Sequence, residues 1–213
     1  MTYSLHPETF VSELQETRFP NTFNPYADHC QAFDKPDAPK LRSRILREIL
    51  VAACDVELDA IWVGRDLGHR GGRRTGLALT DDLQFSDHLK RWGIEAERPT
   101  HGGLVRERTA SIVWDMLHKI ERHIFLWNVF PLHPHPKNTT FGNRAHNAAE
   151  RKVGCLLLVS ILTMLRPRRV VAVGNDAAWV LNSLVVGPEL LRVRHPSYGG
   201  EAKFRSQLAS LYL

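Results

Sequence analysis

Short apolar runs that alternate with helical stretches constrain the fold of this chain more than any other feature. Four runs rich in β-branched or aromatic residues are bounded by polar or turn residues: Ala60–Val63, His123–Val129, Val170–Val173 and Leu190–Val193. Helical patterns cover Arg106–Ile120, Arg144–Leu165, the stretch from after Gly174 through Leu181, and Gly200–Leu211. The alternation predicts an α/β fold of three layers, α/β/α, with a central four-stranded parallel sheet.

The segment before the first predicted strand has a different character. A helical spacing of apolar residues covers Leu41–Cys54, and the Pro-, Asn- and Asp-rich stretch Phe19–Pro39 predicts a long loop between two N-terminal helices. We expect residues 1–59 to form a helical extension packed on the domain. Residues 60–213 are then the α/β/α domain, and the whole chain is one globular unit.

Composition excludes several classes of protein. Hydrophobic residues make up 43% and charged residues 24% of the 213 residues, which excludes disordered, collagenous and coiled-coil chains. Cys30, Cys54 and Cys155 are too few and too scattered for a disulfide framework or an iron–sulfur cluster, and they favour a cytoplasmic location. The N-terminus lacks the pattern of a signal peptide, and Cys155–Leu165 is too short to span a membrane. We therefore expect no membrane partner and no cofactor.

Positive charge is modest in total but unevenly distributed. The 28 Lys and Arg residues exceed the 23 Asp and Glu residues by five. One ten-residue stretch holds five basic side chains: Arg65, His69, Arg70, Arg73 and Arg74. Such clustering favours a polyanionic partner such as DNA, although a run of charges is also typical of a solvated face.

Polar residues follow the predicted strands at the points where those strands end. Asp66 comes after the first strand, Asn128 stands at the end of the second, and His195 follows the fourth. In a parallel sheet these ends meet at one edge, where ligands bind. A carboxylate can orient water or stabilise a cation, an amide can read the edge of a heterocycle, and an imidazole can donate to a developing anion. These residue types indicate cleavage at a heterocycle.

Three motifs make the chain resemble the uracil-DNA glycosylase superfamily. They are Gly64-Arg65-Asp66-Leu67-Gly68 after the first strand, Asn128 within LWNVFP, and the late triplet His195-Pro196-Ser197. The resemblance spans roughly residues 60 to 213 and reproduces the order and approximate separation of the family motifs. It implies a uracil-DNA glycosylase-like fold and a monofunctional DNA glycosylase that flips a base out of the DNA stack and hydrolyses its N-glycosidic bond.

The resemblance also implies roles for individual residues. Asp66 and His195 would be catalytic: Asp66 would position water and stabilise an oxocarbenium-like sugar, and His195 would stabilise charge on the base oxygen. Asn128, Gly68 and Leu79 would form the base pocket. The residues expected to contact DNA are Arg65, His69, Arg70, Arg73, Arg74, Arg144, Ser197 and Tyr198. Of these, Tyr198 is the candidate wedge that fills the space left by the flipped base.

Departures from the family pattern bear on the substrate. Leu67 replaces the proline of the first motif, Gly68 stands where strictly uracil-specific enzymes have a tyrosine, and Leu79 stands where an aromatic normally stacks on the base. Gly68 and Leu79 imply a roomier pocket for uracil or a bulkier modified pyrimidine. The biological setting would be base-excision repair or defence against phage with modified DNA.

Other interpretations remain open at this point. Leu67 and Leu79 also fit a non-catalytic DNA-binding module, and a nucleoside or nucleotide hydrolase could use the same edge of the sheet. Asp66 could be a helix cap, and His195 could bond only to the backbone. His133 and His135 have the spacing of a metal site, but the prolines of PLHPHP favour an extended loop, so we expect no metal.

Overall fold

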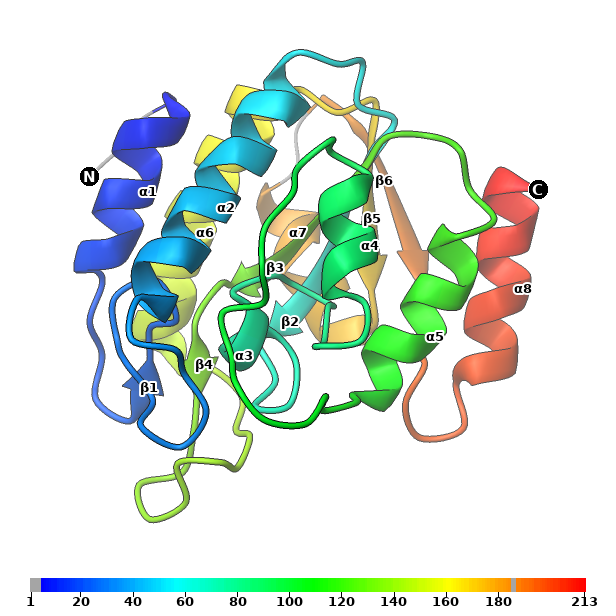
Figure 1. Ribbon diagram of the computed structural model, residues 1–213. Coiled ribbons are helices and arrows are strands. Elements are labelled where there is room, and N and C mark those ends of the chain that lie inside the picture. Colours follow the sequence, from blue (N-terminus) through cyan, green and yellow to red (C-terminus); the bar gives the residue numbers. More distant parts are fainter. Residues whose placement is uncertain (1–4, 185–186) are drawn as a thin grey trace.

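The computed structural model describes residues 5–184 and 187–213, and its centre is a four-stranded parallel sheet (Figure 1). The strands are β2 (Ala60–Asp66), β3 (Ile124–Phe130), β5 (Arg169–Val173) and β6 (Glu189–Val193). They lie in the order β3-β2-β5-β6, and each neighbouring pair is parallel. The predicted fold class is therefore confirmed.

Helices cover both faces of this sheet. One layer contains α1 (Pro7–Glu16), α2 (Ala38–Cys54), α6 (Ala148–Leu165) and α7 (Asn175–Leu184). The other contains α5 (Arg108–Leu117) and α8 (Glu201–Tyr212), at the right of Figure 1. Successive side chains of β2 pack against opposite helix layers, because side chains alternate in direction along a strand. Ile61 and Val63 pack into the first core, whereas Ala60 and Trp62 pack into the second.

The N-terminal segment shares its core with the sheet. Phe10 of α1 and Ile45 of α2 are fully buried in the same cluster as strand residues. The predicted loop between these helices contains the short strand β1 (Thr22–Phe23), which pairs antiparallel with β4 (His133–Pro134). Residues 5–59 are thus part of the globular body, and residues 1–4 of the predicted extension lie outside the described residues. No helix in the described ranges is long and apolar enough to cross a membrane.

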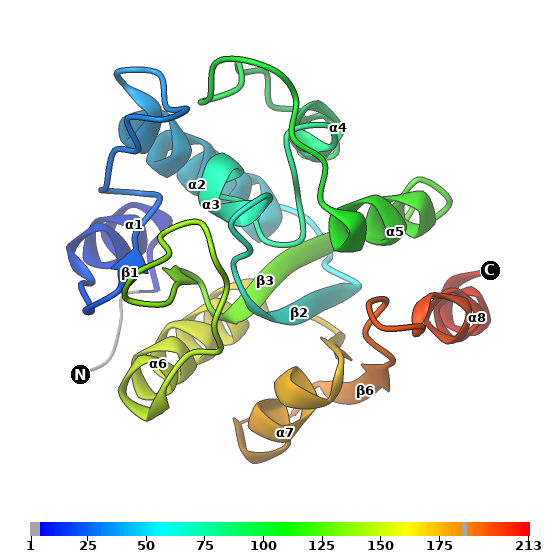
Figure 2. The same ribbon diagram turned by 90° about the horizontal axis from the view of Figure 1, so that it is seen from below.

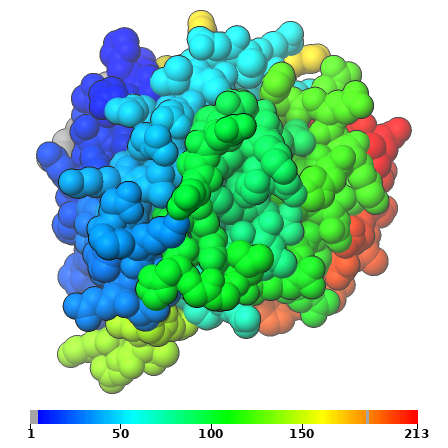
Figure 3. All heavy atoms as spheres, in the orientation of Figure 1, coloured from blue at the N-terminus to red at the C-terminus, as the bar shows by residue number. Residues whose placement is uncertain are grey.

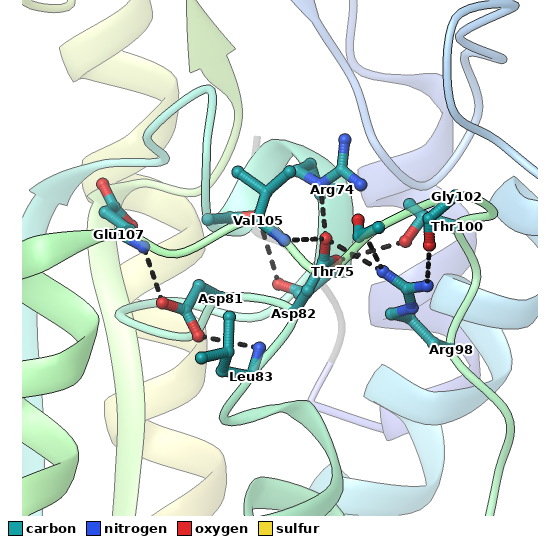
Figure 4. A network of polar contacts seen from close by, with 12 residues as sticks. Arg74, Thr75, Asp81, Asp82, Leu83, Arg98, Thr100, Gly102, Val105 and Glu107 are labelled. Atoms are coloured by element: carbon teal, nitrogen blue, oxygen red, sulfur yellow. Dashed lines mark hydrogen bonds and ion pairs between the residues drawn. The ribbon is translucent and has the colours of Figure 1, made fainter.

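The segment between β2 and α5 contains two short helices that the sequence analysis did not predict. They are α3 (Gly72–Thr75) and α4 (Phe85–Lys90). Two buried carboxylates hold the connecting loops in place (Figure 4). Asp82 accepts hydrogen bonds from Thr100 Oγ1 and the Val105 N–H, both at 3.1 Å, and Asp81 accepts one from the Glu107 N–H at 2.6 Å.

Helix α6 begins four residues later than predicted, at Ala148. The Asn147 side chain accepts a hydrogen bond from the Glu150 N–H at 3.0 Å, and the Glu150 carboxylate accepts one from the Asn147 N–H at 2.7 Å. This reciprocal pair is a capping box, which fixes the first turn of the helix. The preceding chain forms a loop, and its part around residues 135–143 projects from the bottom of the molecule in Figure 3.

Close packing of α6 on β3 gives a prediction for stability. A Cβ atom on Gly154 would lie 2.2 Å from the Val129 carbonyl oxygen, so the Gly154→Ala protein must move the helix away from the sheet. We expect the free energy of unfolding, measured in urea, to fall by about 1–3 kcal/mol. Gly103→Ala is the matched control, because its Cβ would meet nothing within 4 Å. Equal stability of the two variants would contradict this account of the packing.

Candidate active site

The predicted catalytic side chains lie at the edge where the parallel strands end, which Figure 2 views from below. Asp66 is the last residue of β2, and Asn128 lies near the end of β3. The register of the two strands pairs Gly64 with Asn128 and Asp66 with Phe130. The loop after β6 carries His195 to the same edge, beside Gly174, which follows β5.

Asn128 is a buried amide without a hydrogen-bond partner in the described part of the chain. The residue is 1% exposed, and neither its Nδ2 nor its Oδ1 is satisfied. The neighbouring Gly64 makes room for it, because a Cβ there would lie 2.4 Å from Asn128 Oδ1. Leaving buried polar atoms unpaired costs about 1–3 kcal/mol, so this amide is poised to pair with a ligand.

Asp66 is held by His146, from the loop before α6, and by its neighbour Arg65 on β2. Its Oδ1 lies 2.5 Å from His146 Nδ1, and its Oδ2 accepts a hydrogen bond from Arg65 Nε at 2.9 Å. The side chains of Asp66 and His146 are only 6% and 7% exposed. Arg65 also donates to Asp176 Oδ2 at 2.5 Å, which anchors its guanidinium. The carboxylate of Asp66 is therefore fixed in orientation.

The contact between His146 and Asp66 was not predicted from the sequence. His146 lies 80 residues after Asp66 in the chain, in the loop that leads into α6. Its only sequence signal is its position between Arg144 and the helix cap Asn147, which fits a surface residue equally well. The contact with Asp66 arises from the fold.

His195 has one ring nitrogen fixed as an acceptor. The Ser197 N–H donates to His195 Nδ1 at 3.1 Å, so the proton of the neutral ring is on Nε2. Burial, helped by the charges of Arg65 and Arg194, lowers the pKa of His195. The neutral ring is therefore favoured at neutral pH, and its Nε2–H is a hydrogen-bond donor.

The two residues expected to widen the base pocket differ in their surroundings. Leu79 has a φ of 53°, which is unfavourable for a leucine, and its carbonyl accepts a hydrogen bond from Trp114 Nε1 at 3.2 Å. Gly68 does not face open space. A Cβ on Gly68 would lie 2.3 Å from Glu107 Oε1, so the Glu107 carboxyl occupies the room that the glycine leaves. The roomier base pocket predicted from Gly68 and Leu79 stays a prediction, and at Gly68 the Glu107 carboxyl takes up the space that a side chain would fill.

Two arginines expected to contact phosphates lie inside the protein, which corrects that prediction. Arg73 is 5% exposed and Arg74 is 6% exposed. The Arg73 guanidinium lies 3.8 Å from the centroid of the Phe23 ring, and Arg74 Nε donates to Asp82 Oδ2 at 2.7 Å. Both side chains stabilise the region after β2 and are not accessible to a phosphate.

The other predicted DNA contacts are distributed along the edge of the sheet. Arg70 is exposed, and Arg65 keeps 42% of its side chain exposed beside Asp66. The His69 N–H donates to Asn143 Oδ1 at 2.9 Å, and burial lowers the pKa of His69. Arg144 donates to both carboxylate oxygens of Glu150 at 2.6 Å, so it connects the loop to α6.

Tyr198 stands out among the side chains of the loop after β6. It is 98% exposed and has a φ of 53°, in the left-handed region that costs an L-residue about 1–2 kcal/mol. The adjacent Ser197 is anchored, because its Oγ lies 3.1 Å from Thr109 Oγ1 on α5. The loop is thus fixed at its base and presents an exposed aromatic ring.

His133, considered above as a metal ligand, has both ring nitrogens occupied. Arg73 Nη1 lies 3.0 Å from Nδ1, and Nε2 lies 2.9 Å from the Gly142 carbonyl oxygen. Burial, together with the charge of Arg73, lowers the pKa of His133 to about 3. The described residues hold no group of three or more His, Cys, Asp or Glu side chains placed to bind a metal ion.

Comparisons with known proteins identify the family of this chain. A family model described as the uracil DNA glycosylase superfamily matches residues 51–211. The chain belongs to this superfamily. The match begins in α2, before β2, and spans the residues of all three motifs. A search of the curated proteins finds no match.

Among solved structures, 41 chains match the fold of this protein. One of them is the crystal structure of wild-type SMUG2 from Pedobacter heparinus, with a TM-score of 0.64 and 12% sequence identity. The alignment covers 97% of this chain and 96% of that chain, so it includes most of the N-terminal helical segment. At this level of identity the likeness shows the fold alone.

The unpaired Asn128 amide gives a prediction that separates stability from binding. Asn128→Leu replaces the amide with an apolar group of similar shape, so the unfavourable burial of unpaired polar atoms disappears. We expect the free energy of unfolding in urea to rise by about 1–2 kcal/mol. A fall in stability would mean that the folded protein does satisfy this amide.

Proposed function

We propose that this protein is a monofunctional DNA glycosylase that hydrolyses the N-glycosidic bond of a flipped deaminated or modified base. The observation that carries the proposal is the buried, unpaired amide of Asn128, on the strand that pairs with the one ending at Asp66. An amide offers both a donor and an acceptor, as the Watson–Crick edge of a base requires. Taking the base out of the stack costs a few kcal/mol, and pairing with Asn128 helps to offset that cost.

Asp66 and His195 act on opposite sides of the bond that breaks. As the C1′–N bond lengthens, positive charge develops on the sugar and negative charge on the base. The Asp66 carboxylate, held by His146 and Arg65, stabilises the sugar cation and orients water toward C1′. His195 Nε2–H donates to the oxygen of the departing base. Water adds to C1′, its proton leaves through the carboxylate, and the base departs to leave an abasic site.

Whether the enzyme also cuts the DNA strand depends on whether an amine at the site can attack the sugar. None of the three motifs contains a lysine, so they offer no amine for a covalent imine with the sugar. We expect the abasic DNA strand to remain intact. Detection of an imine intermediate trapped by borohydride would contradict this point.

Tyr198 and the exposed basic side chains are the proposed contacts to DNA. The ring of Tyr198 is 98% exposed on an anchored loop, which suits a wedge that enters the space vacated by the base. Arg70 and Arg65 remain exposed enough to contact flanking phosphates. The setting we propose is base-excision repair in the cytoplasm, or defence against phage with modified DNA.

Asp66→Asn tests the proposed chemistry. The variant keeps the shape of the side chain but loses its negative charge, so we expect base release to fall by about a hundredfold or more. Mass spectrometry would measure release from DNA that carries uracil, hypoxanthine, mismatched thymine, or hydroxymethylated or glucosylated cytosine. Asp87→Asn on α4 is the matched control, because Asp87 is a half-buried aspartate outside the motifs, with 40% of its side chain exposed.

The same assay separates an enzyme from a DNA-binding module. An enzyme releases at least one base, and Asp66→Asn loses turnover while still binding DNA. Tight DNA binding without any base release by the wild-type protein would contradict the proposal. It would favour the non-catalytic module that Leu67 and Leu79 suggest.

Tyr198→Ala tests the wedge. Duplex DNA must be unstacked before a base can enter the site, whereas a single strand needs little unstacking. We expect the variant to lose about tenfold in kcat/KM on duplex DNA, which corresponds to about 1.4 kcal/mol, and to change little on single strands. Equal losses on both substrates would contradict a wedge function.

A further inference from the structure

Glu107 is a second carboxyl group at this site, and no family motif contains it. A Cβ atom on Gly68 would lie 2.3 Å from Glu107 Oε1, and a Cβ atom on Gly71 would lie 2.0 Å from Glu107 Oε2. Any side chain at either glycine would displace the carboxyl. Gly68 and Gly71 therefore form a cradle for Glu107, and Gly68 is only two residues beyond Asp66.

The backbone of Glu107 is fixed independently of its side chain. Its N–H donates to Asp81 Oδ2 at 2.6 Å, and its carbonyl accepts from the Ser111 N–H in the first turn of α5. Figure 4 shows the Glu107 side chain pointing away from the Asp81 carboxylate that holds its backbone. These hydrogen bonds fix the position of Glu107 through its backbone, so the oxygens of its carboxyl group stay unused.

The carboxyl oxygens of Glu107 form no hydrogen bond or ion pair within residues 5–184 and 187–213. A glutamate with a purely structural role looks different, as Glu150 shows: its carboxylate accepts hydrogen bonds from Arg144, Thr22 and Asn147. Burial and the neighbouring Asp81 raise the pKa of Glu107 to about 7, against the opposing charge of Arg70. A protonated carboxyl can both donate and accept a hydrogen bond.

Two adjacent residues, Leu79 and Thr80, lie close to the positions of both the Asn128 amide and the Glu107 carboxyl. The Leu79 side chain lies 3.2 Å from the Cβ position of Gly64, where Asn128 Oδ1 is the nearest atom. The next residue, Thr80, places its carbonyl oxygen 3.2 Å from the Cβ position of Gly71. Asn128 and Glu107 thus both lie near the two-residue segment Leu79–Thr80.

We infer that Glu107 is a specificity-determining residue that donates a hydrogen bond to a polar group on the edge of the flipped base that faces Gly68. The inference rests on the proposed function. The bases it favours carry an oxygen or nitrogen acceptor at that edge, such as a hydroxymethyl or carbonyl group. A methyl group there, as in thymine, leaves the carboxyl buried without a partner and is disfavoured.

The test compares Glu107→Gln with Glu107→Leu. Glutamine keeps a donor and an acceptor, whereas leucine keeps only the bulk. The kcat/KM would be measured on DNA carrying uracil, 5-hydroxymethyluracil, hypoxanthine or mismatched thymine. We expect Glu107→Leu to lose about tenfold or more on the preferred base and to change the ranking of bases, because one hydrogen bond is lost. Glu107→Gln should stay within about threefold of the wild-type protein.

Glu121→Gln is the matched control, and Gly68→Ala is a second variant that tests the same contact without changing Glu107. Glu121→Gln alters an exposed glutamate beyond the far end of α5 and should have no effect. Gly68→Ala displaces the Glu107 carboxyl without altering Glu107, so it should reproduce the ranking of Glu107→Leu. The double variant should then show no further change. Melting temperatures would identify any variant that fails to fold.

The pH profile gives an independent readout. Arg70 and Asp81 are the charged groups that act on Glu107 within the described chain. Because the donor form is present below pH 7, we expect wild-type kcat/KM on the preferred base to fall above pH 7. This fall should be absent in Glu107→Gln.

The outcomes distinguish this inference from the proposed function. An unchanged ranking of bases in Glu107→Leu would overturn the role of Glu107 while leaving the glycosylase activity intact. A wild-type protein that releases no base would instead overturn the proposed function, and the inference with it. A ranking altered equally by Glu121→Gln would also count against Glu107.

Discussion

The parallel pairing of β2 with β3 is the constraint on which the rest of the site depends. Its register places Gly64 opposite Asn128, and Gly64 supplies the space that the Asn128 oxygen occupies. Because side chains alternate along a strand, a shift by one residue would turn Asn128 toward the other face. The same register ends β2 at Asp66, so one pairing positions both the amide and the carboxylate.

Around this edge, some polar groups are satisfied internally and others are not. Asp66 is held by Arg65 and His146, and His195 Nδ1 is held by the Ser197 N–H. The buried Asn128 amide has no such partner in the described chain, and the half-buried Glu107 makes its hydrogen bonds there through its backbone alone. Buried polar groups are usually paired in folded proteins, so the unpaired Asn128 amide at this edge is a place where a ligand can complete the pairing. In the proposed reaction, Asp66 supplies a fixed negative charge, His195 supplies a fixed hydrogen-bond donor, and the unpaired groups recognise the base.

Sequence patterns predicted the parts of the molecule that depend on local information. Runs such as Val170–Val173 specify buried strands through their β-branched composition, and the strand ends located Asp66 and Asn128 correctly at one edge. Contacts between distant segments were not predictable. Arg73 and Arg74 were predicted to lie on the surface, because no sequence pattern shows that Phe23 will cover Arg73 or that Asp82 will pair with Arg74. Likewise, His146 and Glu107 reach the site only through the fold.

The central claim is that the Asn128 amide pairs with a flipped base. Nitrogen-15 NMR of the Asn128 side chain, assigned by its absence from Asn128→Leu, tests this most directly. The DNA would carry uracil, 5-hydroxymethyluracil or hypoxanthine on a 2′-fluoro sugar that resists hydrolysis. The account predicts that the Asn128 amide protons shift and exchange slowly with one of these DNAs, but not with abasic DNA. An unchanged Asn128 signal with every bound DNA would contradict the account.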